Sequence, residues 1–466
     1  MRTILDIPPE ILAAAFEMGI YSTGIRFIYP VALVCRDWCE IVNDTPRLWG
    51  ILFIGRKTSP KILQRRLEKA KASPLSIMVS SKAPIYSKNL EGPLKDLVAL
   101  SRNWVALDAN FDFISLVRWK DLCRNLEELT LFPGRKYQNS QDTFFDDVDP
   151  SSVDRDVKLH SLTATSLPHL WIRGFLGPKV RHLTITGAYE STENEDRDLR
   201  HRTMNIRDTI DFLKRVPHAT SIALNDLNHT DPIGYSPPVV RLQKLQRLEL
   251  NGVLFSSTIL SSVSAPCLQT LSLNNDRDTW DRFSPPIVPM ASFLSQWSQP
   301  GFTPTHLHTL DLINCLALGD IPFLIRWLGK LPNLVQFFLV DDDNVHGNAA
   351  LQSLDPPSSL ENEQNDLLYA LAHPLFDDDG KGMWLCPSLM VLRIDPAADM
   401  KGLLSIAHAR GGIATYSYDA NMVPPPSRLR EIRTHLCSIT GRNDIDQLNS
   451  LMDQVYCSCL DCGLSV

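Results

Sequence analysis

The sequence predicts an α/β protein in which helix–strand units repeat along most of the chain. Three observations support this prediction. A short leucine-rich phrase recurs eight times after residue 125, segments with helical spacing precede several copies, and the first fifty residues contain two apolar helical stripes. Alternation on a period of two indicates strands, whereas apolar residues three and four apart indicate helices.

The first expected element is a helix that begins at Pro8 and Pro9. Proline suits the first turn of a helix, and the carboxylate of Glu10 suits its positive N-terminal end. The apolar stripe of this helix consists of Ile11, Leu12, Ala15 and Phe16. The polar stretch from Gly19 to Gly24 predicts a loop after it.

A second helix is expected from Tyr29 to Val42. Its apolar positions are Val31, Val34, Cys35, Trp38 and Ile41. Pro46 is expected to end the helical run, because an interior proline removes a backbone hydrogen bond, and Trp49 is expected to be buried.

The segment from Ile4 to about Ile54 resembles an F-box, the adaptor-binding module of SCF ubiquitin ligases, and especially the F-box proteins of fungi. The resemblance is carried by Ile7-Pro8-Pro9-Glu10-Ile11-Leu12, Phe16, Val34-Cys35-Arg36-Asp37-Trp38 and Thr45-Pro46-Arg47-Leu48-Trp49. Ile7 stands where the family usually has Leu. The alternative is an unrelated apolar helical hairpin.

The resemblance implies that this segment holds a Skp-family adaptor. The positions that match the family's adaptor-binding residues are Pro8, Glu10, Ile11, Leu12, Phe16, Val34, Cys35 and Trp38. We expect Leu12 and Phe16, one turn apart, to contribute to an apolar patch that stays exposed in the isolated chain.

Beyond this segment, Pro60 to Ala72 predicts a linker helix with a solvated basic side that includes Arg65, Arg66 and Lys69. Ser73-Pro74 ends this helix, and the alternating residues from Pro74 to Val79 predict a strand. A further strand is expected from Trp104 to Leu107.

The repeated phrase has the form Leu-x-x-Leu-x-Leu. Its eight central residues are Leu129, Leu183, Ile222, Leu248, Leu271, Leu310, Phe337 and Leu392. The closest copies lie about 23 to 27 residues apart, which is within the period of leucine-rich repeats. The helices expected before copies of the phrase are Ile206–Val216, Met290–Trp297, Ile321–Leu331 and Asp366–Leu375.

These units predict a curved leucine-rich-repeat solenoid with a parallel sheet on its concave face, because one unit cannot bury its apolar side alone. The alternative is a doubly wound α/β domain, whose strands are more continuously apolar. The predicted division is an F-box at 1–56, a linker helix at 57–73, the solenoid at 74–436 and a C-terminal cap or tail at 437–466.

The open face of this sheet is the predicted target-binding surface. The period of two turns Leu248 and Leu250 into the core and leaves the residues between the leucines on the surface. The candidate substrate-binding residues are Glu128, His182, Arg247, Glu249, Asn251, Asp311, Phe338 and Arg393. Phe132 is a second possible aromatic anchor, and Asp395 is also expected on this face.

Known catalytic motifs are absent from the sequence, and we expect no cofactor. The acidic loops around Asp341–Asp343 and Asp377–Asp379 lack calcium-loop spacing, and Asp142–Asp156 is expected to be a mobile acidic loop. Cys457, Cys459 and Cys462 provide three zinc-ligand types without a visible fourth, so free thiols are expected and no metal.

Composition limits the partners and the location. A net charge of −7 argues against a nucleic-acid-binding face, and no apolar run is long enough to span a membrane. Thinly spread cysteines and the lack of a signal peptide predict a cytoplasmic and/or nuclear location.

The resemblance therefore implies a non-catalytic substrate receptor of an SCF-type ubiquitin ligase. Its expected partners are a Skp-family adaptor, cullin through that adaptor, and an unknown protein substrate, with no nucleic acid and no membrane. The alternative is a non-degradative interaction scaffold that uses the adaptor without ubiquitin transfer.

Overall fold

Fourteen parallel strands of the described residues, alternating with short helices, form the framework of this α/β protein. The computed structural model describes residues 7–80, 90–110, 113, 125–133, 158–167, 172–187, 206–225, 227, 237–252, 256–274, 290–299, 301–316, 319–340, 358–376, 382–395, 400–411, 426–434 and 442–457. The chain forms two compact units, Met1–Arg202 and Thr203–Val466.

The first unit begins with a group of short helices. They are α1 (Pro9–Thr23), the 3₁₀ helix η2 (Ile25–Phe27), α2 (Ile28–Ala32), α3 (Arg36–Asp44) and α4 (Pro46–Trp49). The prediction of a loop from Gly19 was wrong, because α1 continues to Thr23 and ends only at Gly24, whose φ is +87°. The hydroxyls of Ser22 and Thr23 donate to the carbonyls of Met18 and Gly19, so polar residues fit inside this last turn.

The prediction of one helix from Tyr29 to Val42 was also wrong. The chain breaks between α2 and α3, where Cys35 is extended with φ −156° and ψ 173°. This break turns Trp38 toward α1, where its ring centroid lies 5.0 Å from that of Phe16. The contact between these two aromatic rings therefore favours the break over a continuous helix.

The end of the helical run near Pro46 is confirmed only in part. Helix α3 does end at Asp44, but Pro46 then begins the short helix α4. Proline suits this position because the first residue of a helix needs no backbone donor. The predicted burial of Trp49 is confirmed, and its indole donates to the Val42 carbonyl at 2.8 Å.

The remaining elements of the first unit form the start of the sheet. They are β1 (Ile51–Ile54), α5 (Pro60–Ala70), β2 (Leu75–Val79), α6 (Glu91–Ala99), the 3₁₀ helix η3 (Ser101–Asn103), β3 (Trp104–Asn110), β4 (Glu128–Phe132), β5 (Ser161–Thr165) and β6 (His182–Thr186). Strands β1 to β6 pair in sequence order, each parallel to the next.

The basic side of α5 is partly buried, so the prediction of a fully solvated side was wrong. Arg66 is buried, and the ammonium of Lys69 lies 3.9 Å from the centre of the Trp49 ring. Lys69 also donates to Asn43 at 2.8 Å. Burial and the neighbouring Arg65 lower the pKa of Lys69. These contacts join α5 to α3 and α4.

The second unit repeats the strand-and-helix pattern. Its strands are β7 (Ser221–Asn225), β8 (Val240–Arg241), β9 (Arg247–Asn251), β10 (Val263–Ser264), β11 (Thr270–Asn274), β12 (Thr309–Ile313), β13 (Gln336–Val340), β14 (Leu375–Phe376), β15 (Gly382–Met383), β16 (Val391–Asp395), β17 (Glu431–Thr434) and β18 (Gln454–Cys457). Its helices are α10 (Ile206–Arg215), α11 (Ser256–Ser261), α12 (Ala291–Trp297), α13 (Ile321–Leu328), α14 (Ser358–Ala372), α15 (Met400–Arg410) and α16 (Arg442–Leu451).

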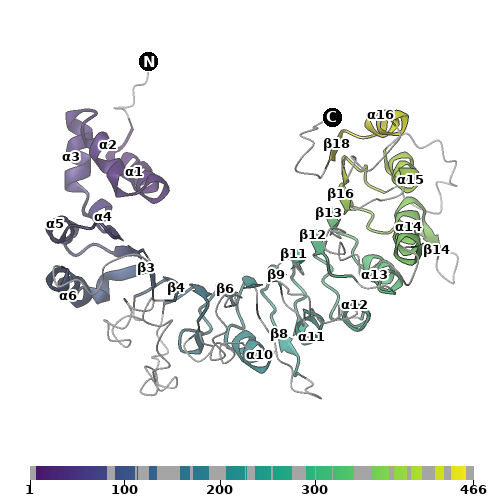
Figure 1. Ribbon diagram of the computed structural model, residues 1–466, viewed down its shortest axis with the longest axis horizontal. Helices are drawn as coiled ribbons and strands as arrows, with labels where there is room; N and C mark the ends of the chain where they lie inside the picture. Colours follow the sequence, from purple (N-terminus) through teal and green to yellow (C-terminus); the bar gives the residue numbers. More distant parts are fainter. Residues whose placement is uncertain are drawn as a thin grey trace, which may run out of the picture. The chain divides into compact units, whose positions relative to one another are not determined.

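The main sheet of this unit follows the order β7, β9, β11, β12, β13, β16, β17, β18, whereas β8 pairs with β10 and β14 with β15. The helices α10 to α15 lie on one side of the strands (Figure 1). A doubly wound sheet would reverse its order and carry helices on both faces. The sequential order is instead consistent with a leucine-rich-repeat-like architecture.

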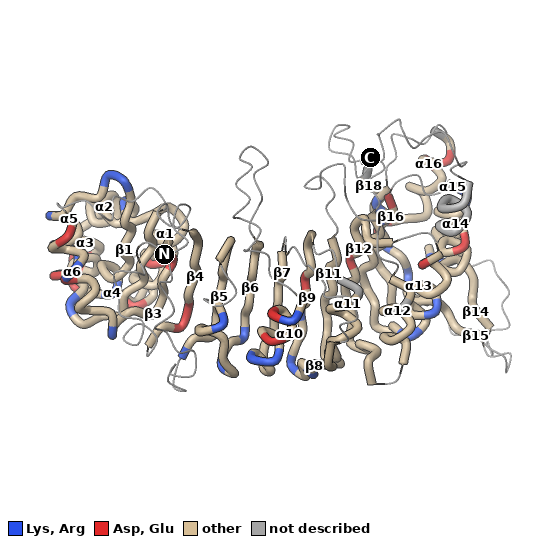
Figure 2. Tube along the Cα trace, turned by 60° about the horizontal axis from the view of Figure 1, so that its bottom comes forward, with Lys and Arg blue, Asp and Glu red and all other residues tan. Residues whose placement is uncertain are grey.

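The core of the second unit is a ladder of aligned apolar residues. Leu248 pairs with Leu271, which pairs with Leu310, and that residue pairs with Phe337. All four are fully or almost fully buried. In Figure 2 the strands are drawn mainly in tan, whereas α10 carries both blue and red residues, as expected for strands that place one face in the core.

The second half of each of the eight copies of the repeated phrase lies in a strand. The prediction that the phrase marks strands is therefore confirmed. In the main sheet, strands β1, β5, β17 and β18 were missed, and so were the short strands β8, β10, β14 and β15. In β5 the third apolar position is Ala164, and in β17 it is Thr434. Both side chains are fully buried, but neither residue type carries the leucine signal. Helix α14 begins at Ser358 rather than near Asp366, and α13 ends at Leu328 rather than Leu331.

Candidate functional site

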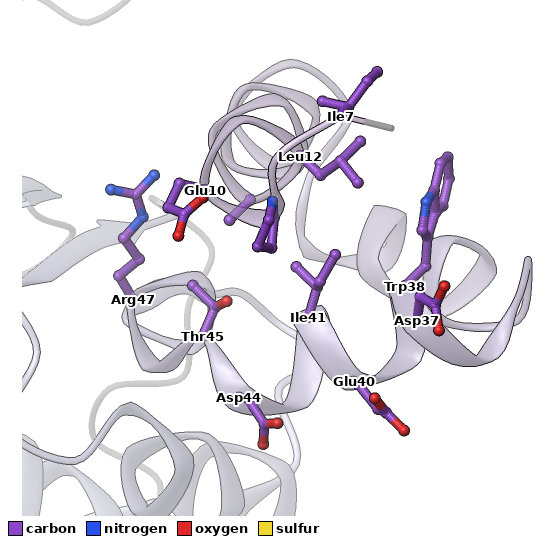
Figure 3. A pocket seen from close by; sticks show the side chains of 12 residues that line it. Ile7, Glu10, Leu12, Asp37, Trp38, Glu40, Ile41, Asp44, Thr45 and Arg47 are labelled. Atoms are coloured by element: carbon purple, nitrogen blue, oxygen red, sulfur yellow. The ribbon is translucent and has the colours of Figure 1, made fainter. Parts of the chain in front are cut away.

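A cavity of about 630 Å³ lies between α1 and the segment formed by α3 and α4 (Figure 3). We call it the α1–α3 groove. It is lined by Ile7, Pro9, Glu10, Leu12, Ala13, Asp37, Trp38, Glu40, Ile41, Asp44, Thr45 and Arg47. Leu12, Trp38 and Ile41 are the lining residues that belong to the two predicted apolar stripes.

The groove combines an apolar interior with an acidic rim. Leu12 and Ala13 are buried, and Trp38 packs on Phe16 behind them. The acidic lining residues are Glu10, Asp37, Glu40 and Asp44, whereas Arg47 is the basic one. Arg47 is itself paired with Glu17 at 3.0 Å. The groove therefore suits an apolar side chain flanked by basic groups.

The predicted adaptor-binding residues divide into buried and exposed ones. The expectation that Leu12 and Phe16 lie in an exposed apolar patch was wrong, because they are only 7% and 4% exposed. Ile11 and Val34 are about equally exposed, at 60% and 61%. Pro8 and Glu10 are also exposed, while Cys35 and Trp38 are half-buried.

Sequence reasoning missed Leu33, which is 86% exposed at the break between α2 and α3. The helix expected there placed Val34 on its buried stripe, and only the break turns both residues outward. Leu33 and Val34 are therefore two neighbouring exposed aliphatic side chains at this break.

The second surface is a row of side chains on the exposed face of the second unit's sheet. We call it the central row. Successive strands pair its members in register, and they are Glu249, Ser272, Asp311, Phe338, Arg393, Arg433 and Tyr456. Acidic residues lie toward β9, a phenylalanine lies in the middle, and basic residues lie toward β18.

The polar groups of this row are held by short contacts. Ser272 donates to the Asp311 carboxylate at 3.3 Å, and Arg393 Nε donates to Asp395 at 2.8 Å. The Arg433 guanidinium pairs with Glu431, and its centre lies 5.7 Å from the middle of the Tyr456 ring. The charged groups are therefore oriented before any partner arrives.

The electrostatics of Asp311 differ from those of an exposed carboxylate. Burial raises the pKa of this carboxyl, the hydrogen bond from Ser272 and the charge of Arg393 lower it, and Glu249 raises it. The net direction is upward. The carboxylate is thus less well solvated than one in water, and a cation beside it would be favoured.

Most of the predicted substrate-binding residues lie where the alternation placed them. Arg247, Glu249 and Asn251 share β9, and Arg247 pairs with Glu249. Glu128 and His182 lie on the first unit's sheet, in one row with Ser161 between them. Asp311, Phe338 and Arg393 come together in the central row.

One residue of the predicted face is not exposed, and two residues in the central row were missed. Asp395 is only 7% exposed, because it lies beside Arg393 at the end of β16. Arg433 and Tyr456 were not predicted because their strands, β17 and β18, lack the leucine phrase. The spacing Leu429-x-x-Ile432 was the signal that could have found the first of them.

A row of amides lies beside the central row, toward the carboxyl ends of the strands. Asn225, Asn251 and Asn274 are register partners on β7, β9 and β11. The Asn251 amide donates to Asn225 at 2.8 Å. Across β7, β9 and β11 this end of the sheet face is therefore polar and uncharged.

The acidic loops at Asp142–Asp156, Asp341–Asp343 and Asp377–Asp379 lie outside the described residues, as do Cys459 and Cys462. Among the residues that the structure does describe, no three His, Cys, Asp or Glu side chains group as a metal site. In that same part of the chain, no helix has both the length and the apolar character to cross a membrane.

The fold and these two surfaces define an α/β protein of repeated strand–helix units with an N-terminal group of helices. A scan against models of known protein families finds no match, and a search of the curated proteins also finds none. The assignment of a function therefore depends on the residues themselves.

Proposed function

We propose that this protein is the substrate-recognition subunit of an SCF-type ubiquitin ligase, with an F-box at its N-terminus and leucine-rich repeats after it. The observation that carries the proposal is the α1–α3 groove together with exposed Ile11 and Val34, two of the residues that match the F-box pattern. The helices present both an acidic-rimmed cavity and aliphatic side chains to a partner.

In this role the chain supplies no catalytic group. The N-terminal helices bind a Skp-family adaptor, which links the chain to cullin, and the sheet face of the repeats holds the target protein. Ubiquitin transfer then gains from a high local concentration of the target's lysines. The chain works in the cytoplasm, the nucleus or both.

The adaptor interface is tested with a double variant, Ile11→Asp/Val34→Asp, coexpressed with a Skp-family adaptor. Two charges in an apolar interface are expected to weaken adaptor binding at least ~100-fold, measured by calorimetry or quantitative pull-down. Both residues are exposed, so the melting temperature is expected to stay close to that of the unmodified chain.

Met18→Asp is the control, because Met18 is 70% exposed on the same helix but is not one of the residues that match the F-box pattern. This variant is expected to bind the adaptor normally. Undiminished binding by the double variant would contradict the proposed interface. Cullin capture by the unmodified complex separates a ligase subunit from a non-degradative scaffold, which would bind the adaptor alone.

A further inference from the structure

The central row places opposite charges at a fixed spacing on the second unit's sheet. Asp311 on β12 pairs in register with Phe338 on β13, which pairs with Arg393 on β16. Neighbouring strands lie about 4.8 Å apart, so the backbone positions of Asp311 and Arg393 are about 10 Å apart. The ring of Phe338 lies on the strand between them.

Each half of the row is continued by a second residue of the same charge. Glu249 lies two strands before Asp311, with Ser272 between them, and Arg433 directly follows Arg393. Tyr456 extends the basic half with another aromatic ring. The row therefore runs from an acidic half, across an aromatic centre, to a basic half.

In the acidic half Glu249 pairs with Arg247, which leaves the Asp311 carboxylate for a ligand cation. Within the described residues Asp311 forms no ion pair, and its carboxylate accepts a hydrogen bond from the uncharged hydroxyl of Ser272 at 3.3 Å. The pKa of Asp311 is raised, first by burial, although the charge of Arg393 acts to lower it. This carboxylate is therefore not paired with a cation of its own in the described part of the chain. A ligand ammonium or guanidinium would supply one.

The basic half is oriented but not shielded from anions. Arg393 uses Nε toward Asp395, whereas a guanidinium carries five N–H donors in a fixed fork. The Arg393 and Arg433 side chains are 33% and 45% exposed. This geometry suits a carboxylate that approaches from solvent.

We propose that the central row binds an extended peptide segment in which a basic and an acidic side chain lie three residues apart. The basic side chain contacts Asp311, the acidic one contacts Arg393, and the peptide backbone between them passes over Phe338. In the polyproline II form of an extended chain, three residues make one turn and each rises about 3.1 Å, so side chains three residues apart lie on the same side of the peptide and span the ~10 Å between Asp311 and Arg393. The inference rests on the proposed function, since it names the kind of target segment that the receptor recognises.

The same arrangement disfavours a polyanion. A phosphate chain that followed the row from Arg433 and Arg393 would meet Asp311 two strands further on and Glu249 two strands beyond that, at about 10 Å per step. Like charges at such distances are repulsive. A peptide with both signs of charge matches the row along its length.

The experiment uses the purified full-length chain, bound to its adaptor where that complex forms, and a phage-displayed library of random dodecapeptides. Selected peptides are expected to be enriched in Lys or Arg three residues from Asp or Glu. A synthetic peptide of the selected sequence is then titrated by fluorescence polarisation. Asp311→Asn and Arg393→Gln are each expected to weaken its binding at least ~10-fold, as for a lost charge-assisted contact.

The double variant Asp311→Arg/Arg393→Asp reverses the pattern. It is expected to lose the selected peptide and to bind one in which the basic and acidic residues are exchanged, within about 10-fold of the original affinity. The control is Asp211→Arg/Arg215→Asp, which exchanges an ion pair of 2.9 Å within α10 and should leave binding unchanged.

Absence of the spaced charge pair among selected peptides would overturn the proposal, as would binding that ignores both single variants. If the exchanged variant fails to fold, peptide binding by the two single variants, Asp311→Asn and Arg393→Gln, tests the proposal. Adaptor binding is measured in parallel. Its loss would contradict the proposed function, while its retention without peptide selection would reject only this inference.

Discussion

At the scale of single residues, Arg410 is the most unusual group among those described. Its side chain is 1% exposed and donates to the carbonyls of Leu371 at 2.8 Å and Cys386 at 3.1 Å, and also to that of Leu385. Burial lowers its pKa to about 10 and raises that of the neighbouring Cys386 thiol to about 12. The guanidinium therefore satisfies carbonyls at the end of α14 and in the turn before β16.

Replacement of this residue by Arg410→Met is expected to lower the free energy of unfolding by about 3 kcal/mol. The reason is that buried carbonyls would lose their donors, each at a cost of about 1 kcal/mol or more. Denaturant unfolding followed by circular dichroism measures the effect. Arg428→Met is the control, because Arg428 is exposed and its pair with Asp453 at 2.7 Å contributes little. Equal loss in both variants would contradict this role for Arg410.

At the scale of elements, the packing of α14 against α15 depends on Gly402. A Cβ atom at this position would lie 2.7 Å from Leu368 Cδ1 and 3.1 Å from Leu368 Cβ. Real Cβ atoms do not approach this closely, so the two helices are near because residue 402 has no side chain. The contact positions α15 beside the strands that carry the basic half of the central row.

We therefore expect Gly402→Ala to destabilise the second unit by about 1 to 3 kcal/mol through overpacking. Gly92→Ala in α6 is the matched control, since a Cβ atom there would have no other atom within 4 Å and alanine favours a helix. Its melting temperature is expected to be unchanged or slightly higher. A Gly402→Ala variant as stable as the Gly92→Ala variant would show that the helices separate easily.

At the scale of the whole molecule, repeated units imply that stability is local. Strand β18 pairs with β17, and α16 packs against α15, so these elements support mainly the last repeats. Because each repeat contacts mainly its neighbours, the loss of stability caused by a deletion at one end is expected to decrease with distance along the chain.

Deletion of residues 442–466 is expected to speed amide exchange in β17 and α15 and to leave α1 to α4 as protected as before. Hydrogen–deuterium exchange with mass spectrometry measures this, and adaptor binding provides a functional check on the N-terminal helices. A uniform rise in exchange across both units would indicate one cooperative unit instead.

The sequence by itself determined the α/β class, the eight leucine-rich strands and most of the residues on the exposed sheet face. These features are local, because a period of two decides which side of a strand each residue occupies. The same reasoning placed Asp311, Phe338 and Arg393 on one face without knowing that they are register partners.

Only the tertiary structure decided the rest. The break at Leu33–Cys35 exists because Trp38 packs on Phe16, and that contact buries Phe16 while Leu33 and Val34 turn to solvent. Strands β5, β17 and β18 form because neighbouring strands offer hydrogen bonds and a core position even to Ala164 or Thr434. The order of charge along the central row follows from strand register, a relation between residues far apart in the chain, which no local pattern records.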